Sequence, residues 1–312
     1  MITAEQATEK VRSAKAKRIK IYPQHVVRAS EIGHPCLKYL VLSISNWEDR
    51  TAHDVGLEFV FEGGNMIENM AIKDLEEAGF KVYRPEPDQT LKEMKPVITG
   101  HLDVRVDFGD GKPITGEIKG LNKYDFDKLN KIEDFFESKK TWIKKYPAQL
   151  MLYMYMKAEE DGFFYLKSVP GFQPKFIFIK LDYEYVESLL KKTELIEKHI
   201  KDGTRPEGIN DIDVCQYCAF KHICLPELKR SSLDLVTDPE LEDNLEKWNK
   251  LRDSYKEYNQ LDKSIKKAIN GKEKLVVGDF LIQGVLVERQ AKQQEAKFIE
   301  ASSYWKYKIA KF

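Results

Sequence analysis

Residues 97–119 read VITGHLDVRVDFGDGKPITGEIK, and this stretch decides the fold that we expect for the chain. The segments from Val97 to Phe108 and from Pro113 to Lys119 are rich in β-branched residues, which favour strands. Gly109-Asp110-Gly111 lies between them and is typical of a turn that closes a hairpin. The sequence therefore predicts two neighbouring strands.

Such a hairpin would bring two carboxylates and a lysine together. Asp103 lies on the first predicted strand, and Glu117-Ile118-Lys119 ends the second. Because side chains alternate across a strand, Glu117 and Lys119 would share one face while Ile118 points into the core and leaves its carbonyl oxygen near that face. Oxygen ligands suit a hard divalent cation, and a lysine beside them can hold or deprotonate a water. The structural alternative is a solvated surface hairpin, because 33% of the residues are charged.

The chain has four cysteines, and one of them, Cys36, lies far upstream of the others. The other three form a C-x2-C-x5-C cluster that consists of Cys215, Cys218 and Cys224. A chain of this length with no signal peptide has little need of disulfides, so the spacing indicates a metal. The candidates are a 4Fe-4S cluster with four thiolates and a structural zinc, which could also recruit His34 or His222.

Several short motifs follow one another in a fixed order. They are Ser30-Glu31-Ile32-Gly33-His34-Pro35-Cys36, Gly64-x3-Glu68, Gly100-His101-Leu102-Asp103, Glu117-Ile118-Lys119, Gln149-x3-Tyr153 and the cysteine cluster. This order resembles the RecB-like branch of the PD-(D/E)XK nucleases over about residues 28–226. More narrowly, it resembles the subgroup with a four-cysteine 4Fe-4S cluster, which includes CRISPR-associated RecB-like exonucleases, the AddB nuclease domain and stand-alone phage exonucleases.

The resemblance implies a role for each matched residue. Asp103, Glu117 and the Ile118 carbonyl would bind Mg²⁺ or Mn²⁺, and Lys119 would be the catalytic lysine. Glu68 would complete the metal site, although many members of the family have histidine there. A carboxylate at this position is an equally good ligand for Mg²⁺ or Mn²⁺ and a poorer one for softer metals.

The same resemblance places Gln149 and Tyr153 at the active site. They are four residues apart on a predicted helix that is entered through Pro147, so they share one face. The structural alternative for Tyr153 is a core aromatic residue with a satisfied hydroxyl. The four cysteines would hold the cluster as a structural clasp. His101 is interpreted as a supporting or core histidine rather than as a ligand.

Strands that alternate with helices predict an α/β fold. The resemblance implies a restriction-endonuclease-like PD-(D/E)XK core with a helical iron-sulfur clasp, and the sequence after residue 226 predicts a C-terminal helix-plus-hairpin appendage. The expected divisions are a basic N-terminal helix (1–27), a nuclease domain (28–226) and the appendage (227–312). The expected helices cover residues 53–79, 124–137, 141–159, 183–201 and 238–270. The further expected strands cover residues 163–168, 175–181, 274–277 and 280–287, before a tail rich in lysine and aromatic residues.

Composition sets the outer limits. The 51 basic and 51 acidic residues cancel, so net charge gives no sign of a nucleic-acid binder. Local basic runs between Lys10 and Arg28 and between Lys139 and Lys145 could contact phosphates, or they could be solvated faces. No apolar run is long enough to span a membrane, and we expect a cytoplasmic protein. The chain has no GxxxxGK[ST] loop and thus no ATP motor of its own.

These patterns and the resemblance together predict a metal-dependent DNA nuclease. The resemblance implies an exonuclease of DNA recombination, repair or processing that acts on single strands or duplex ends and leaves 5′-phosphates. One alternative is a non-catalytic DNA-binding or scaffold subunit of a helicase-nuclease or spacer-integration complex. Another is a zinc-containing enzyme that processes a different nucleic acid, such as RNA. A second copy of the chain, or a helicase or recombination protein, is the expected protein partner.

Overall fold

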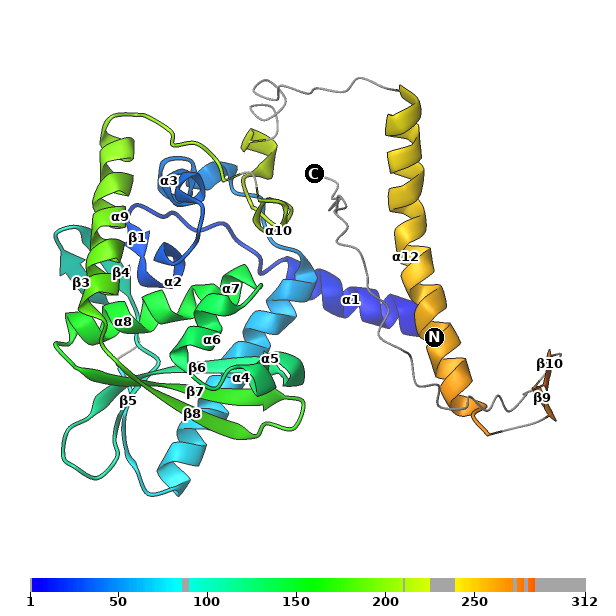
Figure 1. Ribbon diagram of the computed structural model, residues 1–312, viewed down its shortest axis with the longest axis horizontal. Helices are drawn as coiled ribbons and strands as arrows, with labels where there is room; N and C mark the ends of the chain where they lie inside the picture. Colours follow the sequence, from blue (N-terminus) through cyan, green and yellow to red (C-terminus); the bar gives the residue numbers. More distant parts are fainter. Residues whose placement is uncertain are drawn as a thin grey trace, which may run out of the picture. The chain divides into compact units, whose positions relative to one another are not determined.

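The computed structural model describes residues 2–85, 90–209, 211–224, 239–271, 274–277 and 280–283. The chain divides into two compact units, residues 1–226 and 227–312, and each is described by itself. The first unit is a mixed α/β structure, in which helices surround a twisted sheet (Figure 1).

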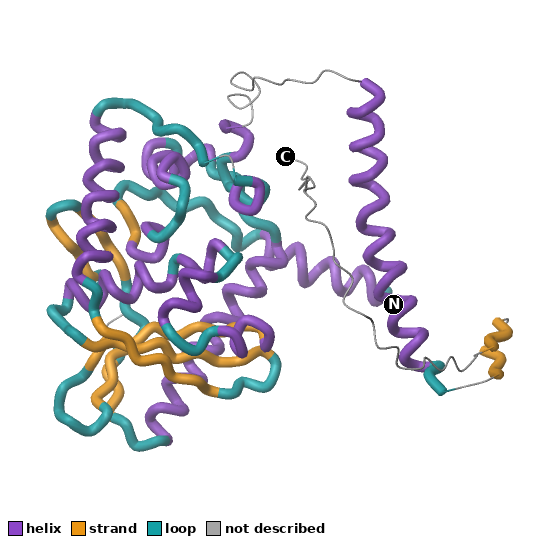
Figure 2. Tube along the Cα trace, in the orientation of Figure 1, coloured by secondary structure: helices purple, strands orange, loops and turns teal. Residues whose placement is uncertain are grey.

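The helices of the first unit are α1 (Ala4–Ala16), α2 (Ala29–Ile32), α3 (Leu37–Ser45), η1 (Trp47–Asp49), α4 (Val55–Glu77), α5 (Lys123–Lys128), α6 (Ile132–Glu137), α7 (Thr141–Lys144), α8 (Tyr146–Met156), α9 (Tyr183–Lys201) and α10 (Ile212–Cys215). Its strands are β1 (Val27–Arg28), β2 (Lys81–Tyr83), β3 (Leu91–Met94), β4 (Val97–Gly100), β5 (Val104–Asp107), β6 (Ile114–Asn122), β7 (Asp161–Val169) and β8 (Pro174–Lys180). Figure 2 shows how these strands cluster among the helices.

The main sheet has the strand order β2-β5-β6-β7-β8. The pair β6 and β7 is parallel, and the other neighbours are antiparallel. A parallel pair needs a long connection, and the helices α5 to α8 supply it here. Strand β6 therefore lies in the middle of the sheet, where its neighbours cover both of its edges. A second sheet, with the order β1-β4-β3, contains the first part of the deciding sequence stretch.

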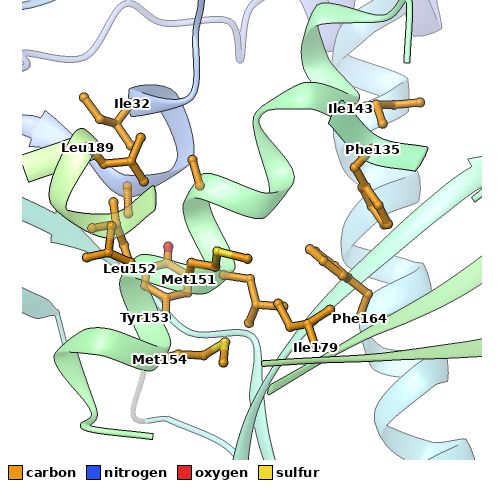
Figure 3. Packing of buried hydrophobic residues seen from close by; sticks show 14 of the residues in the cluster. Ile32, Phe135, Ile143, Met151, Leu152, Tyr153, Met154, Phe164, Ile179 and Leu189 are labelled. Atoms are coloured by element: carbon orange, nitrogen blue, oxygen red, sulfur yellow. The ribbon is translucent and has the colours of Figure 1, made fainter. Parts of the chain in front are cut away.

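Alternation along β7 separates the two faces of the main sheet. Phe163 and Tyr165 pack with Ile67 and other α4 residues, whereas Phe164 and Leu166 pack in a second core with residues of α8. Helix α8 is apolar nearly all round and almost completely buried, and Pro147 in its first turn suits a helix start. Figure 3 shows this core, in which the rings of Phe135 and Phe164 stack at 4.5 Å.

Close approach of the chain requires glycine at two positions. A Cβ atom at Gly100 would lie 2.4 Å from Cε1 of Tyr153, so this glycine lets the tyrosine pack directly on β4. A Cβ atom at Gly33 would lie 2.8 Å from the Cα atom of Lys145, where α2 meets the start of α8. Both glycines belong to motifs that the sequence analysis identified.

The structure corrects the expected strand that ends at Phe108. Residues 97–108 form two strands in different sheets, and Asp103 lies immediately before β5 rather than within a strand. The turn that follows is as expected: the Asp107 carboxylate accepts hydrogen bonds from the backbone N–H groups of Gly109 (2.9 Å) and Gly111 (3.0 Å). Both glycines have positive φ, which is the conformation that favours glycine.

Two expected helices are each divided in two, and a third is shorter than predicted. The Asp134 carboxylate accepts hydrogen bonds from the N–H groups of Asn130 and Lys131, and this contact begins α6 separately from α5. Pro147 lacks an N–H group, and the chain begins the new helix α8 beside it, directly after α7. The N-terminal helix covers Ala4–Ala16 rather than the whole of residues 1–27.

The second unit contains the long helix α12 (Pro239–Ala268) and a small antiparallel sheet of β9 (Lys274–Val277) and β10 (Phe280–Gln283). Gly271, with a φ of 75°, follows the helix end as expected. The rest of the second expected strand of this hairpin and the lysine- and aromatic-rich tail lie outside the described residues.

Candidate active site

Strand pairing places Asp103 beside Glu117. Val104 of β5 pairs with Gly116 of β6, so the residues one step further along the two strands are neighbours. Asp103 also accepts a hydrogen bond at its Oδ2 atom from the backbone N–H of Ile118, at 2.9 Å. The two carboxylates that the sequence predicted to be adjacent are thus held together by the main chain.

The alternation predicted for β6 is observed. The Ile118 side chain is buried among the residues that pack against α4, whereas Leu121 packs in the core on the α8 face. Glu117 and Lys119 have the same parity as Leu121 and therefore belong to the α8 face. Within that face, Lys119 Nζ donates a hydrogen bond to Glu117 Oε1 at 2.5 Å.

Glu117 is fully buried, and its second carboxylate oxygen is not satisfied. Oε2 has no hydrogen-bond partner among the described residues. Burial raises the pKa of Glu117 to about 8, and the neighbouring charge of Asp103 raises it as well, while Lys119 opposes the change. A buried acceptor without a partner costs free energy. This oxygen is therefore the most conspicuous polar atom of the site.

The carboxylates hold the charge on Lys119. Burial alone would lower the pKa of Lys119, but Glu117 and Asp103 outweigh that effect and raise the pKa above its usual value. The Lys119 ammonium also lies 4.9 Å from the ring centroid of Tyr146, a distance at which a cation is attracted to an aromatic face. Lys119 is therefore a cation at neutral pH.

Helix α4 brings Glu68 to the same region. Burial raises the pKa of Glu68, the charge of Asp103 raises it further, and Arg84 and Lys119 oppose this change. Arg84 is exposed and donates a hydrogen bond to Asn69 of α4 at 3.2 Å. The structure therefore brings the third predicted acid into the electrostatic range of the other two.

Gln149 and Tyr153 lie on one face of α8, as their spacing predicted. Both are buried, and Gln149 Nε2 donates a hydrogen bond to the Tyr153 hydroxyl at 3.3 Å. Burial raises the pKa of Tyr153, and the charge of Glu117 adds to this effect. Tyr153 is thus a buried core residue, and the charges of Glu117 and Asp103 also act on its hydroxyl.

Sequence reasoning missed Tyr146. Burial raises its pKa to about 12; the charge of Lys119 opposes this change, and that of Glu117 supports it. Tyr146, Gln149 and Tyr153 have the helical spacing i, i+3, i+7, so the periodicity that identified the last two could also have identified the first. Arg84 was missed for a different reason, because only the fold brings it near Glu68.

The structure corrects the interpretation of His101. It is exposed, although it was interpreted as a supporting or core residue. It lies in the short irregular segment between β4 and β5, which the sequence had suggested was continuous strand. The break removes the strict alternation on which its expected orientation depended.

The donors at the acidic centre suit a hard cation. Within the described part of the chain, no group of three or more His, Cys, Asp or Glu side chains is placed so that it could hold a metal ion. The chemistry of the residues nevertheless fits Mg²⁺ or Mn²⁺: Glu117 Oε2 lacks a partner, and Asp103 and Glu68 add negative charge beside it. A cation there would satisfy the buried oxygen.

The four cysteines occupy one region of the first unit. Burial raises the pKa of Cys218 to about 11, and the charges of Cys224, Cys36 and Cys215 all act on it. Burial likewise raises the pKa of Cys215, with further effects from Cys36 and Cys224. Such mutual effects require proximity, so the fold brings Cys36 to the distant C-x2-C-x5-C segment. Thiols are the ligand type that zinc and iron-sulfur clusters use, but no three of these four described cysteines are placed to hold a metal ion in this structure.

Side chains and main chain around the cysteines tie the same two segments together. The Thr51 N–H donates to the Ala219 carbonyl at 3.0 Å. The Arg50 guanidinium lies 5.6 Å from the ring centroid of the buried Phe220 and 5.7 Å from that of Tyr39. Residues 39–51 therefore hold residues 219–220, which lie within the cysteine cluster.

Glu31 anchors this arrangement from the N-terminal motif. Its carboxylate forms an ion pair with Arg50 at 3.3 Å and accepts a hydrogen bond from Gln24 at 2.9 Å. Burial opposes ionisation, but Arg50 and Gln24 outweigh it and the pKa of Glu31 is lowered. The buried acid therefore remains charged and holds Arg50 in place.

The two histidines near the cysteines differ in environment. His34 is buried, its Nδ1 accepts a hydrogen bond from the Cys36 N–H at 3.1 Å, and its ring stacks on Tyr39. Burial lowers the pKa of His34 to about 3, and the charge of Lys145 contributes, so His34 is neutral at physiological pH. His222 Nδ1 lies 3.4 Å from the Thr51 hydroxyl. Both histidines thus have one ring nitrogen close to a protein group.

The two basic runs are used differently from what charge counting suggests. Lys15 of α1 and Arg18, which follows the end of that helix, both pair with Glu62 of α4, so part of the first run attaches the N-terminal segment to α4. In the second run, burial lowers the pKa of Lys145. Lys139 and Lys144 are exposed.

Comparisons with known proteins found solved structures of low similarity. No protein-family model and no curated protein sequence matches the chain. The crystal structure of SSO0001 is similar over 70% of this chain and 96% of its own, at 16% identity and a TM-score of 0.42. An alkaline exonuclease, LHK-Exo from Laribacter hongkongensis, is similar over 62% of this chain and 93% of its own, at 14% identity and a TM-score of 0.39. Both TM-scores are below 0.5, so we base no argument on these likenesses.

Among the described helices, none is both long enough and apolar enough to cross a bilayer.

Proposed function

We propose that this protein is a divalent-metal-dependent deoxyribonuclease of the PD-(D/E)XK type and acts as an exonuclease. The observation that carries the proposal is the buried Oε2 of Glu117, which has no hydrogen-bond partner among the described residues. Lys119 donates to the other oxygen of the same carboxylate, and Asp103 lies beside Glu117 on the neighbouring chain segment. Natural proteins rarely leave a buried carboxylate oxygen unsatisfied, and those that do so often use it to bind something.

The proposed metal ligands are Glu68, Asp103, Glu117 and the carbonyl of Ile118. A bound Mg²⁺ or Mn²⁺ would supply a Lewis acid that polarises the scissile phosphate. Burial raises the pKa of both Glu68 and Glu117, and the negative charge of Asp103 raises it further, so ionised carboxylates are held here at a cost. A bound cation would offset that cost. The carboxylates whose ionisation is unfavourable in the metal-free protein therefore favour metal binding.

Lys119 is the proposed catalytic cation. Glu117 and Asp103 keep it charged. Its ammonium donates a hydrogen bond to Glu117 and lies 4.9 Å from the ring centroid of Tyr146, and these two contacts restrict its position. A fixed positive charge beside a phosphate stabilises the negative charge that develops as the bond breaks, and it needs no reorganisation to do so. Lys119 would also orient the attacking water.

Gln149 and Tyr153 are proposed to contact the DNA backbone or the water at the reaction centre. Their mutual hydrogen bond at 3.3 Å fixes both side chains on the α8 face. Gly100 supports this geometry, because any side chain there would displace the Tyr153 ring.

A 4Fe-4S cluster held by the four cysteines is proposed as a structural clasp. Its contribution would be to folding, since Cys36 and the other three ligands are far apart in sequence and must be brought together by the fold. A structural zinc remains the alternative. Iron analysis and the visible absorption of the purified protein distinguish the two, because only an iron-sulfur protein is brown.

Recombination or repair of DNA in the cytoplasm is the proposed setting, with a second copy of the chain or a helicase as the protein partner. A scaffold subunit without catalysis is the second candidate for the function. It predicts DNA binding that is independent of Mg²⁺ and no loss of substrate.

The proposal is tested with end-labelled single-stranded and duplex DNA incubated with the purified protein and Mn²⁺, Mg²⁺ or EDTA. We expect degradation with either metal, products that carry 5′-phosphates, and no degradation with EDTA. Matched RNA oligonucleotides serve as the control for substrate class. DNA that stays intact under all metal conditions while remaining bound to the protein would favour the scaffold function instead.

A further inference from the structure

Two exposed aromatic side chains flank the candidate site. Tyr124 is 63% exposed and lies in α5, which directly follows the catalytic strand β6. Trp142 is 40% exposed and lies in α7, which directly precedes α8. Exposure of a large aromatic ring to water costs free energy. Two exposed rings close in sequence to the candidate site are therefore candidates for contacts with a ligand.

Trp142 is connected to the site through one further ring. Its ring meets that of Tyr146 edge to face at 5.9 Å, with an interplanar angle of 66°. The Tyr146 ring in turn lies 4.9 Å from Nζ of Lys119. A continuous path therefore leads from the exposed indole to the proposed catalytic ammonium, and each step is about the size of one aromatic contact.

The segments that carry Tyr124 and Trp142 are fastened to each other. Lys140, two residues before Trp142, forms an ion pair at 2.5 Å with the buried carboxylate of Asp125, which directly follows Tyr124. The charge of Lys139 also reaches the Tyr124 hydroxyl. The segments that carry the two rings are therefore neighbours in the structure.

Lysines accompany both rings. Lys128 Nζ lies 4.0 Å from the ring centroid of Tyr124, and Lys140 Nζ lies 5.4 Å from that of Trp142. Lys139 is exposed nearby. Aromatic faces interleaved with ammonium groups are the chemistry that binds single-stranded nucleic acid, because bases stack on the rings and phosphates pair with the cations.

We propose that Tyr124 and Trp142 form a stacking platform for the bases of a single strand and deliver its end past Tyr146 to Lys119. The inference rests on the proposed nuclease function and adds the substrate class to it. Bases within a duplex stack on one another and leave no free faces, so the platform selects single-stranded DNA or an unpaired end over an intact duplex. Lys128 and the exposed Lys139 contribute the contacts to the phosphates, while Lys140 remains paired with Asp125.

The test compares binding and cleavage for Trp142→Ala, Tyr124→Ala, the double variant and Trp142→Phe. Tyr183→Ala is the matched control, because Tyr183 is 56% exposed but lies just after the β8 end, where Lys180 pairs with the first residue of β7, Asp161. That end of the sheet is opposite to the end of β6 from which Tyr124 follows. Fluorescence anisotropy in EDTA measures the affinity for a labelled oligothymidine strand and for a duplex, and cleavage with Mn²⁺ gives kcat and KM.

We expect Trp142→Ala to weaken binding of the single strand by roughly 5- to 100-fold and to raise KM with little change in kcat. Tyr124→Ala should act in the same direction and the double variant more strongly. Trp142→Phe should retain most of the affinity because it keeps an aromatic face, and Tyr183→Ala should equal the wild type. Duplex affinity should change little in any of these variants.

Unchanged single-strand affinity in the Trp142→Ala, Tyr124→Ala double variant would overturn the platform, and so would an equal loss of duplex affinity. These outcomes differ from failure of the proposed function. A wild-type protein that binds single strands through these rings but never cleaves them would refute the nuclease and leave the platform standing. If the wild type cleaves single-stranded DNA and the double variant cleaves it with the same kcat and KM, the platform alone is refuted.

Discussion

Lys119 donates a hydrogen bond to Glu117, two residues before it on β6, and the two side chains form an ion pair on the same face of the strand. Only one carboxylate oxygen is used in this contact. The other oxygen of Glu117 is buried without a hydrogen-bond partner in the described structure. The pair therefore fixes a cation and leaves an acceptor available at adjacent points, which is the arrangement that metal-assisted phosphodiester hydrolysis needs.

The buried acid predicts a pH-dependent stability in the metal-free protein. Burial raises the pKa of Glu117 from 4.5 to about 8, so folding favours the protonated form. The stability that Glu117 contributes is complete below the unfolded pKa and is lost as the pH rises through the folded value. Thermal melting in EDTA should show this loss between about pH 5 and about pH 8. Mg²⁺ should restore the stability at the upper end of that range.

Glu117→Gln is the control for this prediction, because its amide keeps the shape and cannot titrate. The variant should lack this part of the pH dependence and should gain nothing from Mg²⁺. An identical Mg²⁺-induced rise in melting temperature in wild type and variant would show that the cation binds elsewhere.

Glu68 should be a functional ligand despite the histidine that the resembled family often has there. Glu68→Ala should reduce cleavage about as strongly as Asp103→Ala, and Glu68→His should keep some activity with a changed preference between Mg²⁺ and Mn²⁺. Glu77→Ala, in the exposed last turn of the same helix, should have no effect on cleavage. Near wild-type rates for Glu68→Ala would mean that Asp103 and Glu117 complete the site alone.

Gly100 should be intolerant of even one methyl group. Alanine there would place Cβ 2.4 Å from Tyr153 Cε1 and 2.7 Å from the tyrosine hydroxyl. We expect Gly100→Ala to destabilise the fold by about 1–3 kcal/mol, as overpacking does, and to reduce cleavage because the Tyr153 hydroxyl moves.

Gly63→Ala tests the same substitution where there is space, since nothing lies within 4 Å of a Cβ atom at that helical position. It should stabilise the protein by about 0.5–1 kcal/mol. Urea unfolding of both variants measures these changes. A Gly100→Ala protein as stable and as active as wild type would show that Tyr153 has no fixed role.

The cysteine region should act through folding rather than through chemistry. Replacing Cys36 with Ala should remove the iron and its visible absorption, and should lower Tm by on the order of 5–10 °C. Cleavage by the soluble fraction should fall only in proportion to the folded protein. Iron content, thermal melting and cleavage are to be measured on one preparation. Full iron content together with an unchanged melt would mean that Cys36 is an ordinary core residue.

Local sequence rules predicted those parts of the site that depend on one element. The alternation along β6 separated Ile118 from Glu117 and Lys119, and the i, i+4 spacing placed Gln149 and Tyr153 on one helix face. The long helix predicted over residues 53–79 was also close to the observed α4 (Val55–Glu77), and Gly79, with a φ of 84°, follows its end. In these cases the periodicity of side chains along one element, with a glycine beyond its end, was sufficient for the prediction.

Relationships between distant elements were beyond such rules. At the break between β4 and β5, Gly100 packs on Tyr153 and Asp103 accepts a hydrogen bond from Ile118, and both contacts join segments that no local pattern relates. Arg84 reaches the neighbourhood of Glu68 only through packing of β2 on α4. The connection from Trp142 through Tyr146 to Lys119 likewise depends on how α7, α8 and β6 pack.

The central claim is that Asp103, Glu117 and Lys119 form a metal-dependent nuclease centre, and one parallel assay tests it most directly. Wild type, Asp103→Asn, Glu117→Gln and Lys119→Ala are incubated with end-labelled single-stranded DNA and Mn²⁺, after melting curves have confirmed that each protein is folded. Lys180→Ala, which changes an exposed side chain at the end of β8, is the matched control. We expect wild type and Lys180→Ala to degrade the DNA, and each site variant to be slower by roughly 10²- to 10³-fold or more. Degradation at the wild-type rate by folded Lys119→Ala and Glu117→Gln proteins would contradict the claim.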